Sequence, residues 1–360
     1  MIRPFALSDI AFVHRLQSQS LYLAVDPGMI GFRSPLFLAF TAPVPWFGLG
    51  VATYVLRDRS SGQSVAGFAQ MCKRTGRPEA DLIYIAPHLG DQSEQANPEI
   101  WQNLLAHCAR QAGGQGLQRL YAAVPDEAAD LLELFQQAGF SLYARDTLYR
   151  RPPAALTLEI ENWAGIRPQQ EGDHWPLIRL YDRLTPQLVR SVEGTLIQGK
   201  QRIHPAEALL GSGYKNGFVL EEAGEIVGVV WVRSQRQACH LRLLVDDLAP
   251  RSARYAELLL ACGLSALPHS DQRPVYCAVR DYQGGLVTSL ERYGFMPWVE
   301  RALLVKHMVV TAKKPARKAL DVLPELPLTV LQTQGNGQGR EQLLPDSSPT
   351  TALRSTGAFS

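Results

Sequence analysis

The sequence predicts two tandem copies of one α/β domain, and an internal repeat is the first observation that predicts it. The stretch Tyr121–Phe140 reads Y-A-A-V-P-D-E-A-A-D-L-L-E-L-F-Q-Q-A-G-F. It aligns without a gap with Tyr276–Phe295, which reads Y-C-A-V-R-D-Y-Q-G-G-L-V-T-S-L-E-R-Y-G-F. The offset is 155 residues, and seven of the twenty positions are identical. A repeat of this period is far longer than a solenoid unit and has the size of a domain.

The second observation is the pattern within each copy of the repeat. An apolar strand ends at Asp126 or Asp281, and apolar residues then recur at the spacing of a helix. Each helix ends before a glycine, Gly139 or Gly294, because glycine readily adopts the left-handed conformation that follows a helix. Both copies therefore predict a strand, a helix and a further strand.

The third observation is the composition, which suits two globular domains. The chain has 360 residues, of which 46% are hydrophobic, enough for two buried cores. The formal net charge is +2, and Lys and Arg balance Asp and Glu over residues 1–310. A neutral body argues against nucleic acid or an anionic membrane as a partner.

No stretch of the sequence predicts export or a membrane span. The five cysteines form no C-x-x-C pair, which suits a reducing compartment, and Met1–Leu16 lacks the apolar core of a signal peptide. The uncharged stretch Pro35–Leu56 is long enough to span a bilayer. Because Pro43 and Pro45 interrupt it, we interpret it as a buried helix end, a loop and a strand. We therefore expect a cytoplasmic protein.

The first copy has the order β-α-(α)-β-β-β-α-β-α-β. Ser8 and Asp9 can cap its first helix, and Asn97-Pro98 suits the start of its long helix, with Asn as the cap and Pro in the first turn. Besides the repeat unit, we expect strands at Ile2–Pro4, Val51–Leu56, Val65–Met71, Ala80–Pro87 and Ser141–Tyr149.

The second copy has the same order. Ile166–Pro168 repeats the I-R-P of Ile2–Pro4, and Leu241–Val245 matches Leu82–Ile85 as the central strand. The other expected elements are helices at Trp175–Leu184 and Tyr255–Leu267 and strands at Phe218–Leu220, Ile226–Val232 and Glu300–Val309. We expect the two copies to form twin lobes, each with its own sheet.

These elements give the expected domain boundaries. The two domains would cover residues 1–150 and 164–310, with a linker at 151–163. In the tail, 311–360, Lys, Pro, Gln, Gly, Ser and Thr dominate and no period survives, which predicts disorder.

The element order, together with the G-F after each last helix, resembles the GNAT superfamily of acyl-CoA-dependent N-acyltransferases. The chain looks like a tandem GNAT protein. The resemblance implies an α/β (α+β) fold of two tandem GNAT-like domains, each a mixed, mostly antiparallel sheet flanked by helices. It also implies acetyl-CoA, or another acyl-CoA, as co-substrate.

In GNAT proteins a loop of the form Q/R-x-x-G-x-G/A begins the helix after the central strand. Backbone amides and the positive end of the helix dipole make this a site for the pyrophosphate of CoA. In the second copy Arg251 and Ala256 fit the first and last positions, and Arg254 stands where the family has glycine. The resemblance implies that amides near Leu244 and Val245 bind the pantetheine arm. It implies that the pyrophosphate is bound by Arg251, Ser252, Ala253, Arg254, Tyr255 and Ala256.

The corresponding loop of the first copy runs from Gly90 to Glu99 and has no basic residue. It carries Asp91 and Glu94 where phosphate would lie. We therefore expect the first copy not to bind CoA in the usual way and to act as a structural and substrate-shaping partner.

The proton-transfer groups of the family are incomplete in both copies. A tyrosine that often protonates the leaving thiolate is replaced by Phe135 and Leu290, and Tyr293 is interpreted as a packing residue. Asp81 and His240 lie near the starts of the two central strands, and we favour His240 as a candidate base because its unperturbed pKa lies near neutrality. A polar residue at the edge of a strand is the alternative interpretation of His240.

Other motifs give weaker indications. Glu221, Glu222 and Glu225 suit a solvated hairpin turn, or recognition of a cationic substrate. No histidine pair has metal-binding spacing, and His204–Glu207 is a weak match, so we expect no metal.

The first functional hypothesis is an acetyl-CoA-dependent N-acyltransferase in which a small-molecule or peptide amine attacks the thioester directly. The alternative is a catalytically inactive GNAT-like binding or scaffold protein. The sequence does not specify the acceptor, the acyl group or the oligomeric state.

Overall fold

The computed structural model describes residues 1–26, 34–41, 50–58, 65–89, 98–153, 165–197, 201–203, 216–267 and 272–308. Residues 1–312 form one compact unit, and 313–360 are a second unit. The predicted disordered tail, most of the first copy's loop at 90–97 and the weak His204–Glu207 motif lie outside the described residues.

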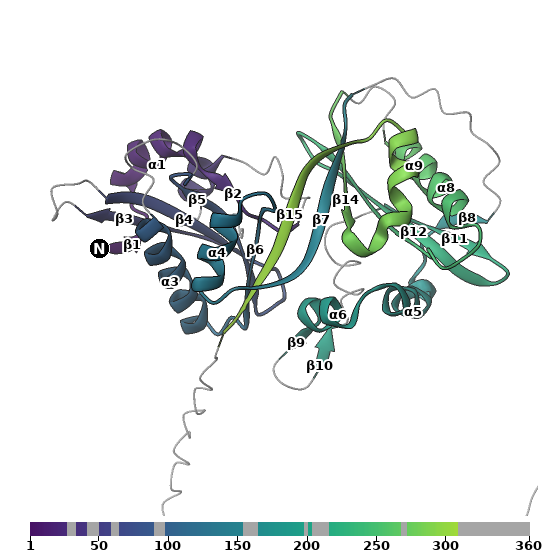
Figure 1. Cartoon of the computed structure of the whole chain (residues 1–360), viewed down its shortest axis with the longest axis horizontal. Coiled ribbons are helices and arrows are strands. Elements are labelled where there is room, and N and C mark those ends of the chain that lie inside the picture. The colour runs from purple at the N-terminus through teal and green to yellow at the C-terminus, as the bar shows by residue number, and fades with distance from the viewer. Residues whose placement is uncertain are drawn as a thin grey trace, which may run out of the picture. The chain divides into compact units, whose positions relative to one another are not determined.

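The first copy contains every strand and helix that the sequence predicts (Figure 1). Its elements are β1 (Ile2–Pro4), η1 (Leu7–Asp9), α1 (Ile10–Leu16), η2 (Gln17–Gln19), β2 (Leu21–Tyr22), α2 (Pro35–Thr41), β3 (Val51–Asp58), β4 (Val65–Lys73), β5 (Glu79–Ala86), α3 (Pro98–Gly114), β6 (Arg119–Pro125), α4 (Ala129–Gln137) and β7 (Ser141–Arg151). The uncharged stretch at 35–56 holds α2 and β3, and no helix among the described residues is long and apolar enough to cross a membrane.

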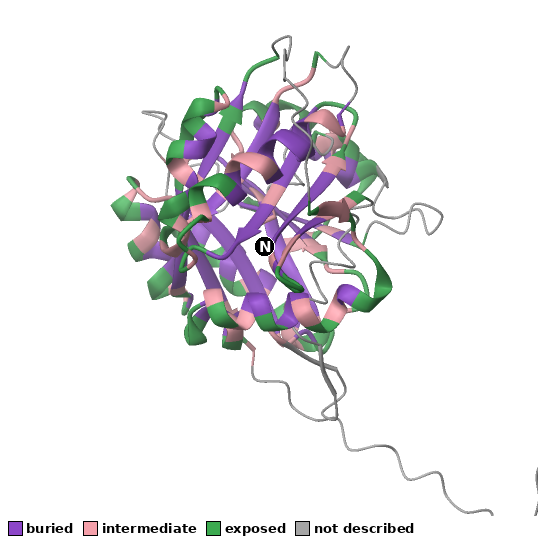
Figure 2. Cartoon of the chain, turned by 90° about the vertical axis from the view of Figure 1, so that its right-hand side faces the viewer, coloured by how far each residue is buried: buried purple, intermediate pink, exposed green. Residues whose placement is uncertain are grey.

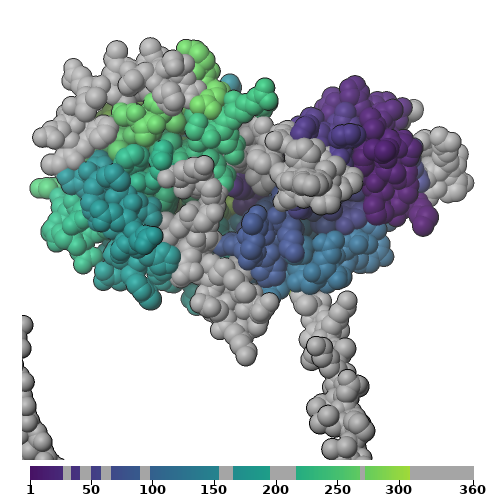
Figure 3. Space-filling model, turned by 180° about the vertical axis from the view of Figure 1, so that it is seen from behind, coloured from purple at the N-terminus to yellow at the C-terminus, as the bar shows by residue number. Residues whose placement is uncertain are grey.

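The second copy repeats this order with two changes. Its elements are β8 (Ile166–Pro168), η5 (Glu171–Asp173), α5 (His174–Leu184), α6 (Gln187–Glu193), β9 (Thr195–Ile197), β10 (Gln201–Ile203), β11 (Asn216–Glu222), β12 (Glu225–Ser234), β13 (Cys239–Val245), α8 (Ser252–Ser265), β14 (Val275–Arg280), η6 (Asp281–Leu286), α9 (Val287–Arg292) and β15 (Met296–His307). The small sheet of β9 and β10 has no counterpart among the described residues of the first copy, and β2 has none among those of the second, whereas α6, like α2, lies between the first helix and the hairpin. Figure 3 colours the first copy purple to blue and the second teal to yellow.

The expectation of two separate sheets is wrong. The chain forms one 13-stranded sheet in the order β1-β3-β4-β5-β6-β15-β7-β14-β13-β12-β11-β8, with β2 paired to β5 off this path. Helices cover the sheet in both halves, so the strands are mostly buried and the outer helix faces exposed (Figure 2). The largest core clusters lie under α3 and α4 in the first half and under α8 and α9 in the second.

An exchange of the last strands joins the halves. β15, from the second copy, lies between β6 and β7, and β7, from the first copy, lies between β15 and β14. Each copy has one long strand after its last helix, so each sheet would end in an unpaired edge there. Pairing with the other copy's strand removes both edges, which are otherwise a site of non-specific association.

The exchange is centred on a buried ion pair. Asp146 and Arg301 are 155 residues apart, so they occupy the same position in the two copies, and they are directly paired in the register of β7 and β15. Arg301 Nε donates to Asp146 Oδ1 at 2.9 Å and Nη2 donates to Oδ2 at 2.8 Å. The guanidinium also donates to the carbonyls of Ala24 and Val25 at 3.2 and 3.4 Å, so four of its five N–H groups are paired.

A second ion pair is repeated in each copy. Arg3 donates to both carboxylate oxygens of Asp9 at 2.6 and 2.8 Å, and Arg167 does the same to Asp173 at 2.8 Å for both bonds. Each aspartate also accepts from the backbone amide three residues earlier. Asp9 stands at the N-cap position of α1, but its side chain makes no cap bond to that helix, contrary to the prediction. Its carboxylate instead closes the preceding turn η1, and Asp173 closes η5 in the same way.

The two predicted glycines end their helices in the left-handed conformation. Gly139 has φ +81° and Gly294 has φ +78°. The following phenylalanines return to the helix, because the amide of Phe140 donates to the carbonyl of Phe135 at 2.9 Å and that of Phe295 to Leu290 at 3.0 Å. The G-F motif thus turns the chain from the last helix of each copy into its exchanged strand.

The central ion pair is expected to contribute strongly to stability. Arg301→Met leaves the carboxylate of Asp146 buried without its partner and should lower the free energy of unfolding by about 3–5 kcal/mol in urea denaturation. Arg145→Met is the matched control, because its pair with Asp126 is partly exposed, and should cost less than about 1 kcal/mol. Equal losses in the two variants would show that the exchange does not depend on this pair.

Candidate functional site

The candidate site is an opening between two parallel strands of the second copy. β13 and β14 pair through only three residue pairs, of which Leu241–Cys277 is the last. β13 continues to Val245 and β14 to Arg280. The two strands therefore diverge, and beyond Leu241 no described strand pairs with that edge of β13.

The equivalent opening in the first copy is closed by β2. β5 and β6 also pair through three residue pairs, ending at Asp81–Tyr121. The amide of Leu23 donates to the carbonyl of Ile83 on β5 at 2.9 Å, and the amide of Ala123 on β6 donates to the carbonyl of Leu23 at 2.6 Å. The chain thus bridges the gap with its own backbone. In the second copy the segment after the first helix forms α6 instead.

The backbone of β13 directs two amides towards the opening. The amide of Asp246 donates to the carbonyl of Val227 on β12 at 2.8 Å. Because successive residues of a strand point alternately to its two neighbours, Leu244 also directs its amide to β12. Leu243 and Val245 direct theirs to the opening. Of the two residues predicted to bind pantetheine, Val245 therefore faces the opening and Leu244 belongs to the ladder with β12.

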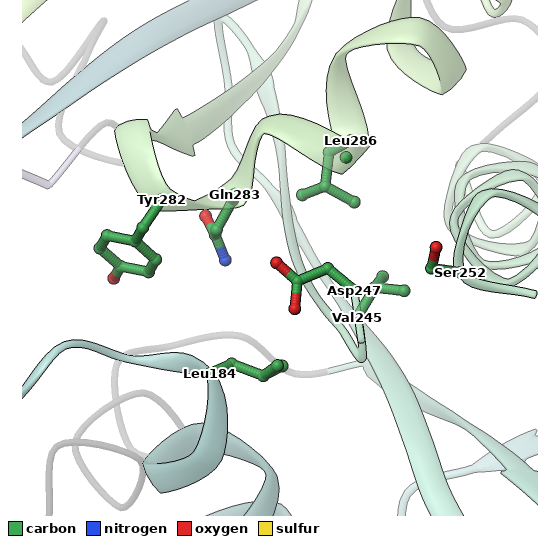
Figure 4. Close-up of a pocket in the computed structure, with 8 residues that line it drawn as sticks. Leu184, Val245, Asp247, Ser252, Tyr282, Gln283 and Leu286 are labelled. Atoms are coloured by element: carbon green, nitrogen blue, oxygen red, sulfur yellow. The ribbon is translucent and has the colours of Figure 1, made fainter. Parts of the chain in front are cut away.

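A pocket lies where the opening meets α8 (Figure 4). It is lined by Leu184, Val245, Asp247, Ser252, Tyr282, Gln283, Gly285 and Leu286. These residues come from the end of α5, the end of β13 and the turn after it, the first turn of α8, and η6. The pocket brings together two residues of the predicted site, Val245 and Ser252.

The first turn of α8 faces this pocket. No side chain caps the helix, and the amide of Ser252 donates to the carbonyl of Ala249 at 3.0 Å. A helix of 14 residues presents the positive end of its dipole and its first amides at this point, which is the arrangement that binds phosphate groups.

Two acidic side chains at the end of β13 oppose an anion at this position. Asp246 is buried, and its Oδ2 accepts from Arg183 Nη2 at 2.6 Å. Asp247 is exposed and lines the pocket. Sequence reasoning missed both, although D-D directly after the central strand is visible in the sequence.

Arg251 is exposed and held by the β11–β12 hairpin. Its Nη1 donates to Glu222 Oε1 at 2.9 Å, and the hydroxyl of Tyr255 donates to Glu222 Oε2. The hydrogen bond from Tyr255 is the largest cause that lowers the pKa of Glu222, and the bond from Arg251 lowers it further. The carboxylate of Glu222 is therefore charged near neutral pH. The predicted phosphate-binding arginine thus already has an anionic partner.

The other residues of the predicted loop lie along the first turns of α8. Ala253 and Arg254 are exposed, and Arg254 Nη1 lies 3.7 Å from Glu257 Oε2. Ala256 is buried in the core under α8. Cofactor binding by these residues stays a prediction.

His240, the predicted base, is buried at the start of β13. Its side chain is stacked on Tyr276 with ring centroids 5.6 Å apart, and neither ring nitrogen has a hydrogen-bond partner among the described residues. Burial is the main cause that lowers its pKa to about 4. The ring is therefore neutral near pH 7, and its catalytic role stays a prediction.

The structure places apolar side chains at both positions where GNAT proteins often have a proton donor. Phe135 and Leu290 are fully buried in the two cores. Tyr293 packs against the second core, as predicted. Tyr282 on η6 is the tyrosine that lines the pocket, and sequence reasoning missed it because it lies outside the helix where the family has its tyrosine.

No group of three or more potential metal ligands occurs among the residues that the structure describes. The described residues of the candidate site offer backbone amides, a helix N-terminus, and polar and apolar side chains.

The comparisons with known proteins concern the fold. No protein-family model matches the sequence, and no curated protein matches it. Many of the similar solved structures are GNAT acetyltransferases.

Three of the similar structures that cover most of the chain are given as examples. A tandem GNAT protein from the clavulanic acid biosynthesis pathway is 16% identical and covers 85% of this chain and 98% of its own, with a TM-score of 0.45. A GCN5-related N-acetyltransferase from Sphaerobacter thermophilus is 14% identical, with coverages of 85% and 95% and a TM-score of 0.47. A GNAT-family acetyltransferase from Colwellia psychrerythraea is 12% identical, with coverages of 85% and 99% and a TM-score of 0.41.

The buried His240 is expected to make stability depend on pH. Its folded pKa of about 4 lies below the ordinary value of 6.5, so on acidification the unfolded chain takes up the proton first. The contribution of neutral His240 to the free energy of unfolding is full above pH 6.5 and is lost as the pH falls towards 4. His240→Phe keeps a ring against Tyr276 and should remove about 3 kcal/mol of this loss, measured by urea unfolding across that pH range. His14→Phe, at an exposed histidine of α1, should leave the loss unchanged, and equal curves for all three proteins would contradict the assignment.

Proposed function

We propose that the chain is an acyl-CoA-dependent N-acyltransferase with one active site, in the second copy. The observation that supports this best is the divergence of β13 and β14 beyond Leu241 directly before the uncapped N-terminus of α8. A free strand edge offers amides to an amide-containing arm, and a helix N-terminus offers amides to phosphates. Acyl-CoA has both groups in that order.

The free edge of β13 would hold the pantetheine arm. The amides of Leu243 and Val245 would donate to it, and one of them would polarise the thioester carbonyl as an oxyanion hole. The acceptor amine would then attack the carbonyl carbon directly, the bond to the thiolate would break, and no covalent enzyme intermediate would form.

The start of α8 would hold the pyrophosphate. The donors available there are the amides of the first turn, the hydroxyl of Ser252 and the guanidinium of Arg251. Arg251 would exchange Glu222 for phosphate, while Asp247 would limit the affinity by repulsion.

The proton of the attacking amine would pass to His240 directly or through water. Burial leaves the ring neutral, which is the state that accepts a proton, but it also weakens the base. No acid stands at Leu290, so the thiolate would leave without protonation by that position.

The first copy would serve as a structural partner. Leu23, directly after β2, closes its opening through hydrogen bonds to both β5 and β6, so we propose one acyl-CoA per chain. In terms of domains, residues 164–310 would carry the cofactor and residues 1–150 would support the acceptor side.

A binding protein without catalysis is the second candidate. The buried apolar side chains at Phe135 and Leu290 favour it, because they leave both copies without the usual proton donor. Release of CoA in the presence of a panel of amines distinguishes the two candidates, since only an acyltransferase consumes acetyl-CoA.

Acetyl-CoA is expected to raise the melting temperature of the protein by mass action. Calorimetric titration should give one equivalent per chain, because the backbone at Leu23 fills the opening of the first copy. Arg251→Ala should abolish the shift. No shift at millimolar acetyl-CoA would remove the basis of the enzyme proposal, and two equivalents would contradict the closure of the first copy.

The hairpin carboxylate is expected to compete with the phosphates. Glu222→Gln should free Arg251 and tighten acetyl-CoA binding by up to about fivefold, the range of an exposed ion pair. Glu225→Gln is the matched control on the same hairpin, because its carboxylate faces Arg179 at 3.9 Å and not Arg251. If both variants bind like the wild type in titration, the exchange of partners at Arg251 is wrong.

A further inference from the structure

Two arginines lie on the same face of the sheet at the opening. Leu241 and Cys277 are paired and both pack in the core under α8. Because side chains alternate along a strand, Arg242 on β13 and Arg280 on β14 lie on the opposite face. This is the face covered by α5, whose Leu177, Ile178 and Tyr181 pack against the sheet.

Arg280 is fixed by a carboxylate but keeps a free donor. Its Nη2 donates to Glu193 Oε1 at 2.7 Å, and the hydroxyl of Tyr181 donates to Glu193 Oε2 at 3.0 Å. Arg280 Nη1 is buried and has no hydrogen-bond partner among the described residues. Buried donors are nearly always satisfied in native proteins, so this atom indicates a missing partner.

Arg242 is the second donor. It is partly exposed and makes no hydrogen bond or ion pair within the part of the chain that the structure describes. We call Arg242, Arg280, Glu193 and Tyr181 the arginine cluster. Two guanidinium groups and one carboxylate leave the cluster with one uncompensated positive charge.

The arginine cluster adjoins the pocket through Tyr282. Tyr282 lines the pocket, at the end of η6 nearest to β14 (Figure 4). Burial raises the pKa of Tyr282, and the charges of Arg280 and Arg242 act against this rise. Arg280 precedes Tyr282 by only two residues, which places the arginine cluster beside this end of the pocket, on the face of the sheet away from α8.

We propose that the acceptor is an amine that carries a carboxylate, such as an amino acid, and that Arg242 and Nη1 of Arg280 bind this carboxylate. The proposal rests on the function proposed above and specifies its acceptor. Guanidinium groups pair with carboxylates through two parallel hydrogen bonds, which fix orientation as well as position. The carboxylate neutralises the cluster and satisfies the buried donor. Arg242 directly precedes Leu243, so the bound amine lies beside one of the two amides proposed to hold the pantetheine arm and the thioester.

Matched amines that differ only in the carboxylate test the proposal. The probes are L-alanine with ethylamine, L-lysine with cadaverine and L-phenylalanine with 2-phenylethylamine, each tested for a shift in melting temperature without acetyl-CoA. At least one amino acid should raise the melting temperature at about 10 mM, and its decarboxylated partner should not. Arg242→Gln should weaken this binding about tenfold or more, because a charge-assisted pair is lost.

Arg236→Gln is the control, because it removes an exposed arginine from the β12–β13 turn outside the cluster, and it should bind like the wild type. Equal shifts with both members of every pair, no shift with any amino acid, or unchanged binding in Arg242→Gln would overturn the proposal. Because these measurements need no acetyl-CoA, their failure is separate from a failure of the acyltransferase proposal, which the acetyl-CoA titration and CoA release report.

Discussion

The buried pair of Asp146 and Arg301 is the constraint on which the arrangement of the sheet depends. The two residues hold the same position in a duplicated sequence, and they face each other. If two identical copies met in this way, the position would face itself and bring like charges together. Within one chain the copies can differ, so a carboxylate can meet a guanidinium. The pair sets the register of β7 and β15, and this register places β14 and the opening beside it.

The two copies have diverged most where a ligand would lie. Both central strands separate from their neighbour after three residue pairs. In the first copy the backbone at Leu23 occupies the gap. Its amide and carbonyl make the hydrogen bonds that a ligand with amide groups could otherwise make. In the second copy the corresponding segment forms α6, whose last residue, Glu193, lies on the face of the sheet away from α8. The duplication thus combines a copy whose gap is filled by its own backbone with a copy in which no described strand fills the gap.

The sequence predicted local features well and long-range pairing poorly. Apolar periodicity located the strands and helices, and Gly139 and Gly294 marked where both last helices end. The start of α8 at Ser252 also lies within the predicted loop. The exchange of β7 and β15 was not predicted, because a strand carries no local sign of its neighbour. Arg242, Arg280 and Glu193 were missed for the same reason, since they come from separate elements. The burial of His240 depends on packing that its neighbours in the sequence do not reveal.

The position of β15 has a consequence for the synthesis of the protein. β15 is the last strand among the described residues, yet it lies in the middle of the sheet and pairs with β6 of the first copy. On the ribosome the first half therefore emerges with the edge of β6 uncovered, and it keeps that edge until nearly the whole body has been translated. Nascent chains with such edges are prone to associate with one another. The first half is thus completed last, and a chain that stops before Met296 lacks the strand that closes both halves.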